Sequence, residues 1–477
     1  MKLFYKTFII FFVITATFIF ANEWVSTGNI RPASPEWEVN SISDSNIEIN
    51  FNLGGYYIDE VENIGKYISF PGSVPILEKG SPELPRMARS IIIPDLANME
   101  LKVLDSKFIE FPIDNIVPSK GNLTRDINPE EIPYTYSKPY ETDAWYPSEI
   151  VFMRDPYILR SLRGQTIVFQ PVQFNPITRL VRVYTNIKIS VQKNGQSEVN
   201  ILTRRPENNN SREFERMYQD HFINYSTNNR YDILSEQGPM LIISYGDFLD
   251  EMQAFVDWKN YKGIPTEIVD IADVGSVNDM AQYIEDQYYE NGIAFVLLVG
   301  DIDQIETIRR SNGAGSNSPS DNSLTFIAGN DYYPDIIIGR FSAESGAHVE
   351  TMVNRTISYE MNPDPSADWY KKGSGFASNQ GPGDDGEDDD EHMDVIRELL
   401  LNYTYTEVDQ IYDPSGTVAE GEAAINEGRS IINYTGHGSS SSWGNGCPMN
   451  NTNVNGLVNN NMWPFIWSVA CVNGEFE

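Results

Sequence analysis

The sequence predicts an α/β domain built on a parallel sheet, preceded by a β-rich domain. Two observations carry this prediction. Beyond residue 231, short apolar runs alternate with amphipathic stretches of helical length, which is typical of a parallel sheet covered by helices. Before about residue 193, alternating segments such as 166–173 and 180–191 are interrupted by proline and glycine, which is typical of a β-sandwich or barrel.

The composition and net charge of the chain exclude several classes of protein. The chain has 477 residues, of which 40% are hydrophobic, so two or three domains with large cores are expected. Its 68 acidic and 34 basic residues give a formal net charge of −34. Nucleic acid is excluded as a partner, because a surface that binds it has to be positive. With only Cys447 and Cys471, the chain is neither a disulfide-rich scaffold nor a four-cysteine zinc protein.

Residues 1–21 have the pattern of a secretory signal peptide. Lys2 and Lys6 precede an apolar run over residues 7–21, with cleavage expected after Ala21. A membrane anchor is the alternative, but the run is short for a span of ~20 residues. No later stretch is long and apolar enough to cross a bilayer. We therefore expect an exported protein, secreted or at the cell surface, without a membrane span in its mature form.

The predicted β-rich domain covers residues 22–230, and its end changes character. Residues 194–230 are polar, poor in aliphatic side chains and rich in asparagine near 208–210. Such a stretch predicts a linker. A second interpretation is a protease-sensitive joint that is cut between Arg230 and Tyr231, because proteolysis concentrates in exposed polar loops.

The predicted α/β domain extends over residues 231–477. Its expected strands are 240–245, 267–271, 294–300, 336–339, 430–434 and 465–470. Its expected helices are 248–258, 277–289, 349–359, 392–401 and 418–427. The run 294–300 is almost entirely apolar, as expected for a strand buried in the middle of a parallel sheet.

Two of these strands end in reactive side chains. His437 follows one apolar strand, and Cys471 follows the last one. Parallel neighbouring strands would bring these side chains together, as attack of a thiolate on a carbonyl requires. The backbone N–H groups of Gly438 and Cys471 can then stabilise the developing oxyanion. The alternatives are a structural histidine, a buried structural cysteine, or a disulfide between Cys447 and Cys471.

At these motifs the sequence resembles the gingipain-type cysteine peptidases, family C25, which share the caspase-like fold. The matching segments are NYTGHG (433–438), SVACVNG (468–474), FVDWKN (255–260), LLVGD (297–301), GNDYYPDIIIGR (329–340) and, upstream, LRGQTIVFQPV (162–172). The resemblance implies a caspase-like catalytic domain over residues 231–477. It also implies that residues 22–230 are the family's propeptide, which assists folding and blocks the active site.

The resemblance assigns roles to residues of the predicted site. Cys471 would be the nucleophile, and His437 would donate a proton to the leaving amine. The family's carboxylate that orients the histidine is matched here by Gln380, which can hydrogen-bond the imidazole but stabilises an imidazolium less well. Trp443 would help to wall the S1 pocket, and ordinary core packing is the alternative for this side chain.

An acidic run over residues 384–391 is the strongest charge feature of the sequence. Most such runs are solvated, repulsive loops. In arginine-specific members of the family this loop supplies the carboxylate at the base of S1, and the pattern places Asp389 there, with Asp388 and Asp390 as alternatives. A buried carboxylate can pair bidentately with a guanidinium. We therefore expect cleavage after Arg, or after Lys.

Asp331 and Asp335 flank a short turn whose carboxylates and carbonyls can wrap a hard cation such as calcium. Asp301, at the end of a predicted strand, can reach the same ion. The resemblance implies calcium bound by matching residues, including the carbonyls of Ala328 and Tyr333. Turn capping by the aspartates is the alternative. We expect a structural calcium ion.

These features together predict an exported zymogen of a cysteine endopeptidase that acts on proteins or peptides, with its own propeptide as an intramolecular inhibitor. One alternative is a catalytically impaired relative that serves as a secreted binding or surface-assembly protein. Another is a sortase-like transpeptidase. Only six residues follow Cys471, whereas relatives continue well beyond this cysteine, so we expect a C-terminally truncated catalytic domain.

Overall fold

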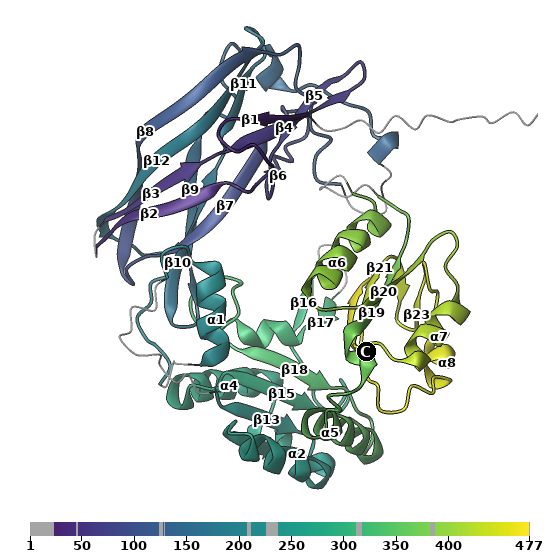
Figure 1. Ribbon diagram of the computed structural model, residues 1–477. Helices are drawn as coiled ribbons and strands as arrows, with labels where there is room; N and C mark the ends of the chain where they lie inside the picture. The colour runs from purple at the N-terminus through teal and green to yellow at the C-terminus, as the bar shows by residue number, and fades with distance from the viewer. Residues whose placement is uncertain are drawn as a thin grey trace, which may run out of the picture.

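The computed structural model describes residues 23–43, 46–123, 127, 129–207, 211–225, 237–311, 317–381 and 387–476. The predicted signal peptide and the predicted cleavage site, Arg230 and Tyr231, lie outside these residues. Figure 1 shows three parts: a β-rich region at the top, a helix-covered sheet at the bottom and a second helix-covered sheet at the right. Among the described residues, no helix has the length and apolar character needed to cross a membrane.

Within the described ranges, twelve strands build the β-rich region. They are β1 (Glu23–Ser26), β2 (Glu36–Ser43), β3 (Asn46–Asn52), β4 (Gly55–Val61), β5 (Gly65–Ser69), β6 (Val74–Pro75), β7 (Pro85–Ile92), β8 (Ala97–Pro112), β9 (Val151–Leu159), β10 (Leu162–Phe169), β11 (Val172–Asn175) and β12 (Leu180–Gln196), with short 3-10 helices η1 (Pro129–Glu131) and η2 (Lys138–Glu141). The strands form sheets with the orders β1-β4-β5, β6-β7-β10-β9 and β11-β12-β3-β2, and β8 also pairs with β12.

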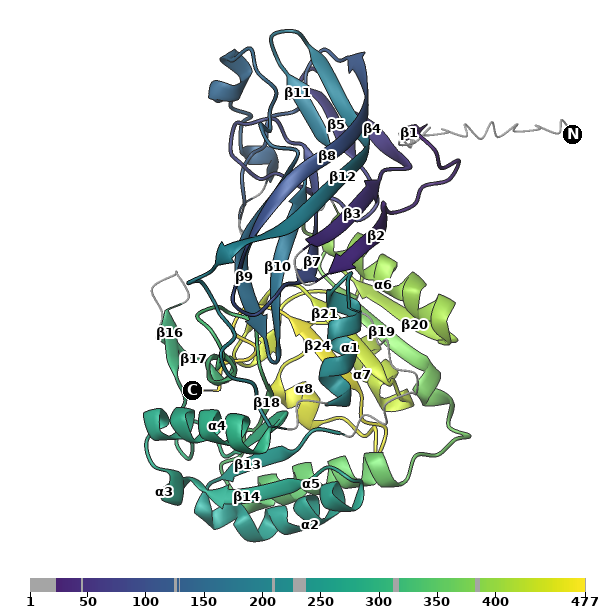
Figure 2. The same cartoon turned by 90° about the vertical axis from the view of Figure 1, so that its left-hand side faces the viewer.

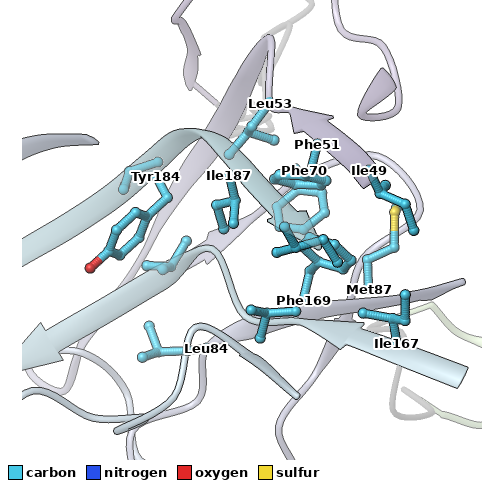
Figure 3. Packing of buried hydrophobic residues seen from close by; sticks show 14 of the residues in the cluster. Ile49, Phe51, Leu53, Phe70, Leu84, Met87, Ile167, Phe169, Tyr184 and Ile187 are labelled. Carbon is cyan, nitrogen blue, oxygen red and sulfur yellow. The ribbon is translucent and has the colours of Figure 1, made fainter. Parts of the chain in front are cut away.

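The core of this region lies between its sheets. Along β3, Ile49 and Phe51 alternate with polar residues, and both side chains are fully buried. They meet Phe169 of β10, whose ring stacks on Phe51 with the centroids 5.1 Å apart. Figure 3 shows these side chains packed with Met87 and Ile187 from two further strands. The predicted β-rich class is confirmed, and its alternating pattern exists because one face of each strand is buried.

The second part is a four-stranded parallel sheet with the order β14-β13-β15-β18. Its elements are β13 (Met240–Ser244), η3 (Gly246–Phe248), α2 (Leu249–Tyr261), β14 (Thr266–Asp270), α3 (Ile271–Val274), α4 (Val277–Asn291), β15 (Phe295–Val299), β16 (Arg309–Ser311), β17 (Asn317–Pro319), η4 (Asp321–Thr325), β18 (Ile337–Phe341) and α5 (Gly346–Met361). Successive side chains of β13 point to opposite faces, so Leu241 and Ile243 pack against α4 whereas Ile242 packs against α2 and α5.

The third part is another four-stranded parallel sheet, with the order β20-β19-β21-β24. Its elements are η5 (Asp368–Lys371), β19 (Lys372–Ala377), α6 (Asp389–Tyr403), β20 (Glu407–Tyr412), α7 (Val418–Glu427), β21 (Ile431–Thr435), β22 (Gly438–Ser439), β23 (Ser442–Trp443), α8 (Asn451–Asn455) and β24 (Phe465–Val469). Phe376, Ile432 and Tyr434 form a buried cluster with residues of α7. The edge strand β24 exposes the side chains of all five of its residues.

The predicted α/β class is confirmed, but the strands form two separate parallel sheets. Within these two parallel sheets, the strands that the sequence does not predict are β19 and β20. Glycines at 373 and 375 weaken the strand pattern of β19, because glycine has a low propensity for strands. A Cβ atom at Gly375 would lie 2.6 Å from Met393 Cγ, so close packing of α6 explains this glycine.

The stretch 194–230, predicted as a linker, contains a helix, α1 (Arg212–His221). Its buried side chains, Phe214 and Tyr218, are four residues apart and therefore share one face of the helix. The polar residues of the same stretch occupy the other face, and their number hides the helical pattern in the sequence.

Candidate active site

Four strand ends lie side by side at one edge of the third part. The paired residues Ala377, Tyr412, Thr435 and Val469 are the last residues of β19, β20, β21 and β24. Because the strands are parallel and in register, the residues that follow them gather at this edge. Gln380, Asp413, His437 and Cys471 follow the four strands within three residues. The sequence predicted three of these four; Asp413 was missed because β20 was missed.

The His437 side chain is held by the side-chain amide of Gln380, the partner that the sequence predicts. Its Nε2 lies 2.8 Å from Oε1 of Gln380. An amide oxygen only accepts hydrogen bonds, so this contact places the proton on Nε2 and leaves Nδ1 to exchange a proton with a thiol. The backbone of His437 is fixed as well: its N–H donates to Asn445 Oδ1 at 2.8 Å, and its carbonyl accepts from Gly444 N at 2.8 Å.

Asp413 fixes the loop that holds the histidine. Its carboxylate accepts a hydrogen bond from Asn445 Nδ2 and another from Gly446 N, both at 2.7 Å. Asn445 in turn accepts from the His437 N–H. The signal in the sequence is weak, because the strand before Asp413, EVDQIY, contains three polar residues.

The Cys471 thiol is free and exposed, and it follows β24 by two residues. The loops after β21 and β24 approach closely here: a Cβ atom at Gly438 would lie 2.8 Å from the Cys471 carbonyl oxygen. Asn473 joins the loops, because its Nδ2 donates to the Ser439 carbonyl at 2.5 Å. Glycine at 438 therefore permits the close approach of these two loops.

Val472 has a left-handed backbone conformation, with φ of 54°. For a β-branched residue this conformation costs on the order of 1–3 kcal/mol. Strain of this kind, immediately after the candidate nucleophile, shows that the turn is imposed by its surroundings, namely the loop contacts of Asn473.

Cys447 does not compete for the role of nucleophile. It is also a free thiol, so the structure contains no disulfide between Cys447 and Cys471. Its side chain is fully buried in the core of the third part, and burial raises the pKa of the thiol to about 12. A buried thiol of this kind is unreactive at neutral pH.

Trp443 packs in the core, which is the alternative interpretation of this side chain, and its place in the wall of S1 stays a prediction. Its ring stacks on Tyr434 with the centroids 4.6 Å apart and meets Phe376 edge-on at 5.7 Å, which is core packing. Its Nε1 donates to Ser468 Oγ at 3.0 Å, next to the strand that leads to Cys471. The indole therefore braces β24 against β21 at the edge where the candidate nucleophile lies.

Of the three aspartates in the acidic run that were considered for S1, Asp389 is the buried one, with 5% of its surface exposed. It lies in the first turn of α6, its carboxylate accepts a hydrogen bond from the Ser378 hydroxyl, and its N–H donates to the Gln380 carbonyl at 2.9 Å. Asp388 caps the same helix through a reciprocal pair with Glu391. The earlier part of the run, residues 384–386, lies outside the described residues.

The predicted calcium ligands are engaged differently from the prediction. Asp335 is fully buried, and its carboxylate accepts N–H groups of Arg160 at 2.8 Å, Ile327 at 2.9 Å and Ala328 at 2.6 Å. Burial raises the pKa of this carboxyl to about 7 despite the three donors. The Asp331 carboxylate accepts from the backbone N–H groups of Ile158 and Tyr333.

Asp301 is not joined to this pair; its carboxylate accepts from Ile302 N and from Ser342 Oγ, both at 2.9 Å. Within the described ranges, no three His, Cys, Asp or Glu side chains form a group that could hold a metal ion. Ala328 and Tyr333 present N–H donors to the aspartates, and calcium needs six to eight oxygens free to bind it. In this arrangement the carboxylates of Asp331 and Asp335 accept backbone N–H groups, and the calcium site stays a prediction.

Family models match both the N-terminal region and the two parallel sheets of the chain. Residues 233–477 match peptidase family C25, and residues 33–231 match the propeptide of that family. Gingipain R2 of Porphyromonas gingivalis is 36% identical over 458 residues, covering 94% of this chain and 61% of the relative. Gingipain R1 of the same organism is 37% identical over 448 residues, covering 91% of this chain and 44% of the relative.

Among solved structures, the chain is similar to one described as the Arg specific cysteine proteinase gingipain R, with 37% identity, a TM-score of 0.48, and coverage of 53% of this chain and 58% of that chain. The chain thus spans about three-fifths of the length of Gingipain R2. The peptidase match extends over both parallel sheets, and the propeptide match extends over most of the β-rich region and α1. This chain therefore belongs to peptidase family C25.

Proposed function

We propose that this chain is part of an exported zymogen whose mature form hydrolyses peptide bonds as a cysteine endopeptidase. The observation that carries the proposal is the placement of His437 and Cys471 just beyond the ends of neighbouring, in-register strands. Membership of a peptidase family supports it. The propeptide match supports an N-terminal region that keeps the peptidase latent until it is cut away near Arg230 and Tyr231.

The proposed mechanism uses the geometry of this edge. The Cys471 thiolate attacks the carbonyl carbon of the scissile bond, and the N–H groups of Gly438 and Cys471 stabilise the oxyanion. His437, positioned by Gln380, donates its proton to the leaving amine, which departs as the thioester forms. A water molecule then gives one proton to His437, and the resulting hydroxide attacks the thioester carbon. The C–S bond breaks, which releases the carboxylic acid and restores the Cys471 thiolate beside the protonated imidazole.

Asp389 supports a preference for arginine on the amino-terminal side of the scissile bond. Asp389 is buried in the first turn of α6, and a substrate guanidinium can pair with a buried carboxylate through two hydrogen bonds. Lysine offers one charged point in place of a planar fork and should be cleaved more slowly. The names of the Gingipain R relatives agree with this preference.

The test measures cleavage of fluorogenic peptides that carry Arg, Lys or an apolar residue on the amino-terminal side of the scissile bond. It compares the full-length processed protein with its Cys471→Ala variant. Arg-selective cleavage that disappears in the Cys471→Ala protein supports the proposal. A folded, processed protein without cleavage would favour the non-enzymatic binding protein, and transfer to an added amine in place of hydrolysis would favour the transpeptidase.

The pocket is tested with matched variants in the same helical turn. Asp389→Asn should lower kcat/KM for Arg peptides roughly a hundredfold or more, because the substrate cation loses its buried partner. Asp390→Asn is the control and should leave the Arg preference unchanged. Equal losses in both variants would contradict the assignment of Asp389.

A further inference from the structure

Two arginines near the tip of the β9–β10 hairpin are the largest fully buried side chains of the described residues. Arg160 and Arg163 each have 0% of their surface exposed. The guanidinium of Arg163 donates only to carbonyls of the β-rich region itself: those of Asn200, Pro94, Ala97 and Val199, at 2.6 to 3.0 Å. Arg160 points the other way, into the peptidase region.

Carbonyls of the peptidase region surround the Arg160 guanidinium. Nη1 donates to the carbonyl oxygens of Ile293 at 3.0 Å and Asp335 at 2.9 Å, and Nη2 donates to that of Gly292 at 2.8 Å. Gly292 is the C-cap of α4, where the helix dipole places partial negative charge. The guanidinium also lies over the ring of Tyr288, 5.3 Å from its centroid. This site is therefore complementary to a planar cation.

The backbone of the hairpin tip is held by the same region. The N–H groups of Ile158 and Arg160 donate to the carboxylates of Asp331 and Asp335, both at 2.8 Å. The Tyr288 hydroxyl donates to the Arg160 carbonyl at 3.0 Å. The turn itself is unusual, because Arg160 has a left-handed conformation with φ of 52°. Every backbone polar group of Arg160 is thus satisfied across the contact between the two family regions.

Apolar packing surrounds this polar anchor. The Tyr157 ring stacks on Tyr333 with the centroids 3.8 Å apart. The ring of Phe214, on α1, also contacts this group: its centroid lies 4.6 Å from the central carbon of the Arg160 guanidinium. In Figure 2 the lower end of β9 and β10 and the helix α1 lie next to the first parallel sheet, on the side of α4 and β18. Water is excluded from the anchor, which strengthens its hydrogen bonds.

We propose that the hairpin tip, residues 157–160, is the anchor that holds the N-terminal region on the peptidase region, with Arg160 as its central residue, so that the two remain a complex after the connection between them is cut. Asp331 and Asp335 serve this anchor by accepting the backbone N–H groups of Ile158 and Arg160. The inference concerns binding and does not depend on peptidase activity.

The test uses the chain with Cys471→Ala, with the recognition sequence of a site-specific protease in place of residues 226–236 and an affinity tag on the N-terminal region. After the cut, the rate at which the peptidase region leaves the immobilised N-terminal region is measured. Arg160→Met should speed release roughly a hundredfold or more, because it removes three buried hydrogen bonds of a charged group.

Arg163→Met is the matched control. It removes four hydrogen bonds of a fully buried arginine three residues away, but all of them lie within the N-terminal region. Release should therefore stay within about threefold of the parent while thermal stability falls. Equal release by both variants would overturn the proposal, as would an unchanged rate for Arg160→Met. If Arg160→Met does not fold, Tyr288→Phe removes only the hydroxyl bond to the Arg160 carbonyl and should still speed release several-fold; no effect would count against the anchor.

Discussion

The amide of Gln380 occupies the position at which a carboxylate would usually orient a catalytic histidine. Its oxygen reaches His437 Nε2 at 2.8 Å, so it can orient the ring and select the tautomer. It carries no charge, so it gives little stabilisation to the imidazolium that accompanies a thiolate. Gln380 therefore orients the imidazole ring without stabilising its positive charge, and substitutions at this position can measure the two effects separately.

Gln380→Glu should raise kcat/KM at neutral pH several-fold and move the alkaline limb of the pH–rate profile to higher pH, because a carboxylate favours the protonated imidazole. Gln380→Ala should lower kcat about ten- to a hundredfold, since the ring loses its partner. The measurement is the pH dependence of kcat/KM on one Arg peptide. A Gln380→Glu profile identical to that of the parent would contradict the role given to position 380.

At the scale of elements, the end of β20 supports the histidine on β21 through two loops. Asp413→Ala should lower kcat about tenfold or more with little change in KM, because residues 444–446 lose both hydrogen bonds that hold Asn445 under the His437 backbone. Asp413→Asn keeps one acceptor oxygen and should recover part of the rate. A change in KM alone would place Asp413 in substrate binding and argue against positioning.

Helices α2 and α5 are joined by one carboxylate. Glu360 accepts from Lys259 Nζ at 2.7 Å and from Lys262 Nζ and Trp258 Nε1 at 2.8 Å. Burial would raise the pKa of the Glu360 carboxyl, but the hydrogen bonds from these three residues lower it overall. A carboxyl whose pKa is lower in the folded state than in the unfolded chain stabilises the fold when it is ionised. This stabilisation is fully present at pH values above the pKa of the unfolded chain, near 4.3, and it is lost as the pH falls through the lower pKa of the folded state.

Glu360→Gln should therefore cost roughly 1–3 kcal/mol at pH 7 and much less at pH 3. The measurement is thermal unfolding of parent and variant at both values of pH. Asp257→Asn is the control on an exposed position of α2, where the aspartate contacts Gln253, and should change little. A Glu360→Gln penalty of the same size at both values of pH would rule out the ionised form as the source of stability.

The sequence predicts elements whose signal is local. Apolar runs such as 294–300 correspond to β15, and the strand ends before His437 and Cys471 correspond to β21 and β24. It misses β19, because Gly375 is set by the approach of Met393 from a helix later in the chain. The contacts of Asp331 and Asp335 are hidden for a related reason: two of their partners, Ile158 and Arg160, lie more than 170 residues away in the sequence.

At the scale of the whole molecule, anchoring and proposed chemistry lie on different sheets. The hairpin tip with Arg160 binds beside β15 and β18 of the first parallel sheet, whereas His437 and Cys471 extend from β21 and β24 of the second. The peptidase region can therefore keep its N-terminal partner through contacts that a substrate at the second sheet does not replace. Release would then require a change at the anchor in addition to a cut in the connection.

Net charge acts on the molecule as a whole and should influence which substrates arrive quickly. At a net charge of −34, the chain has an extended negative field, which raises the rate of encounter with cationic peptides. Salt screens this field, with a Debye length of about 10 Å at 0.1 M.

We expect kcat/KM for an Arg peptide carrying three extra lysines far from the scissile bond to fall about five- to tenfold between 20 and 300 mM NaCl. A peptide with the same cleavage site and three serines should lose less than twofold, because fewer of its charges respond to the field. Adding an uncharged solute at equal osmolality controls for viscosity and solvation. Parallel declines for the two peptides would show that salt acts on the folded site itself, and the steering argument would fail.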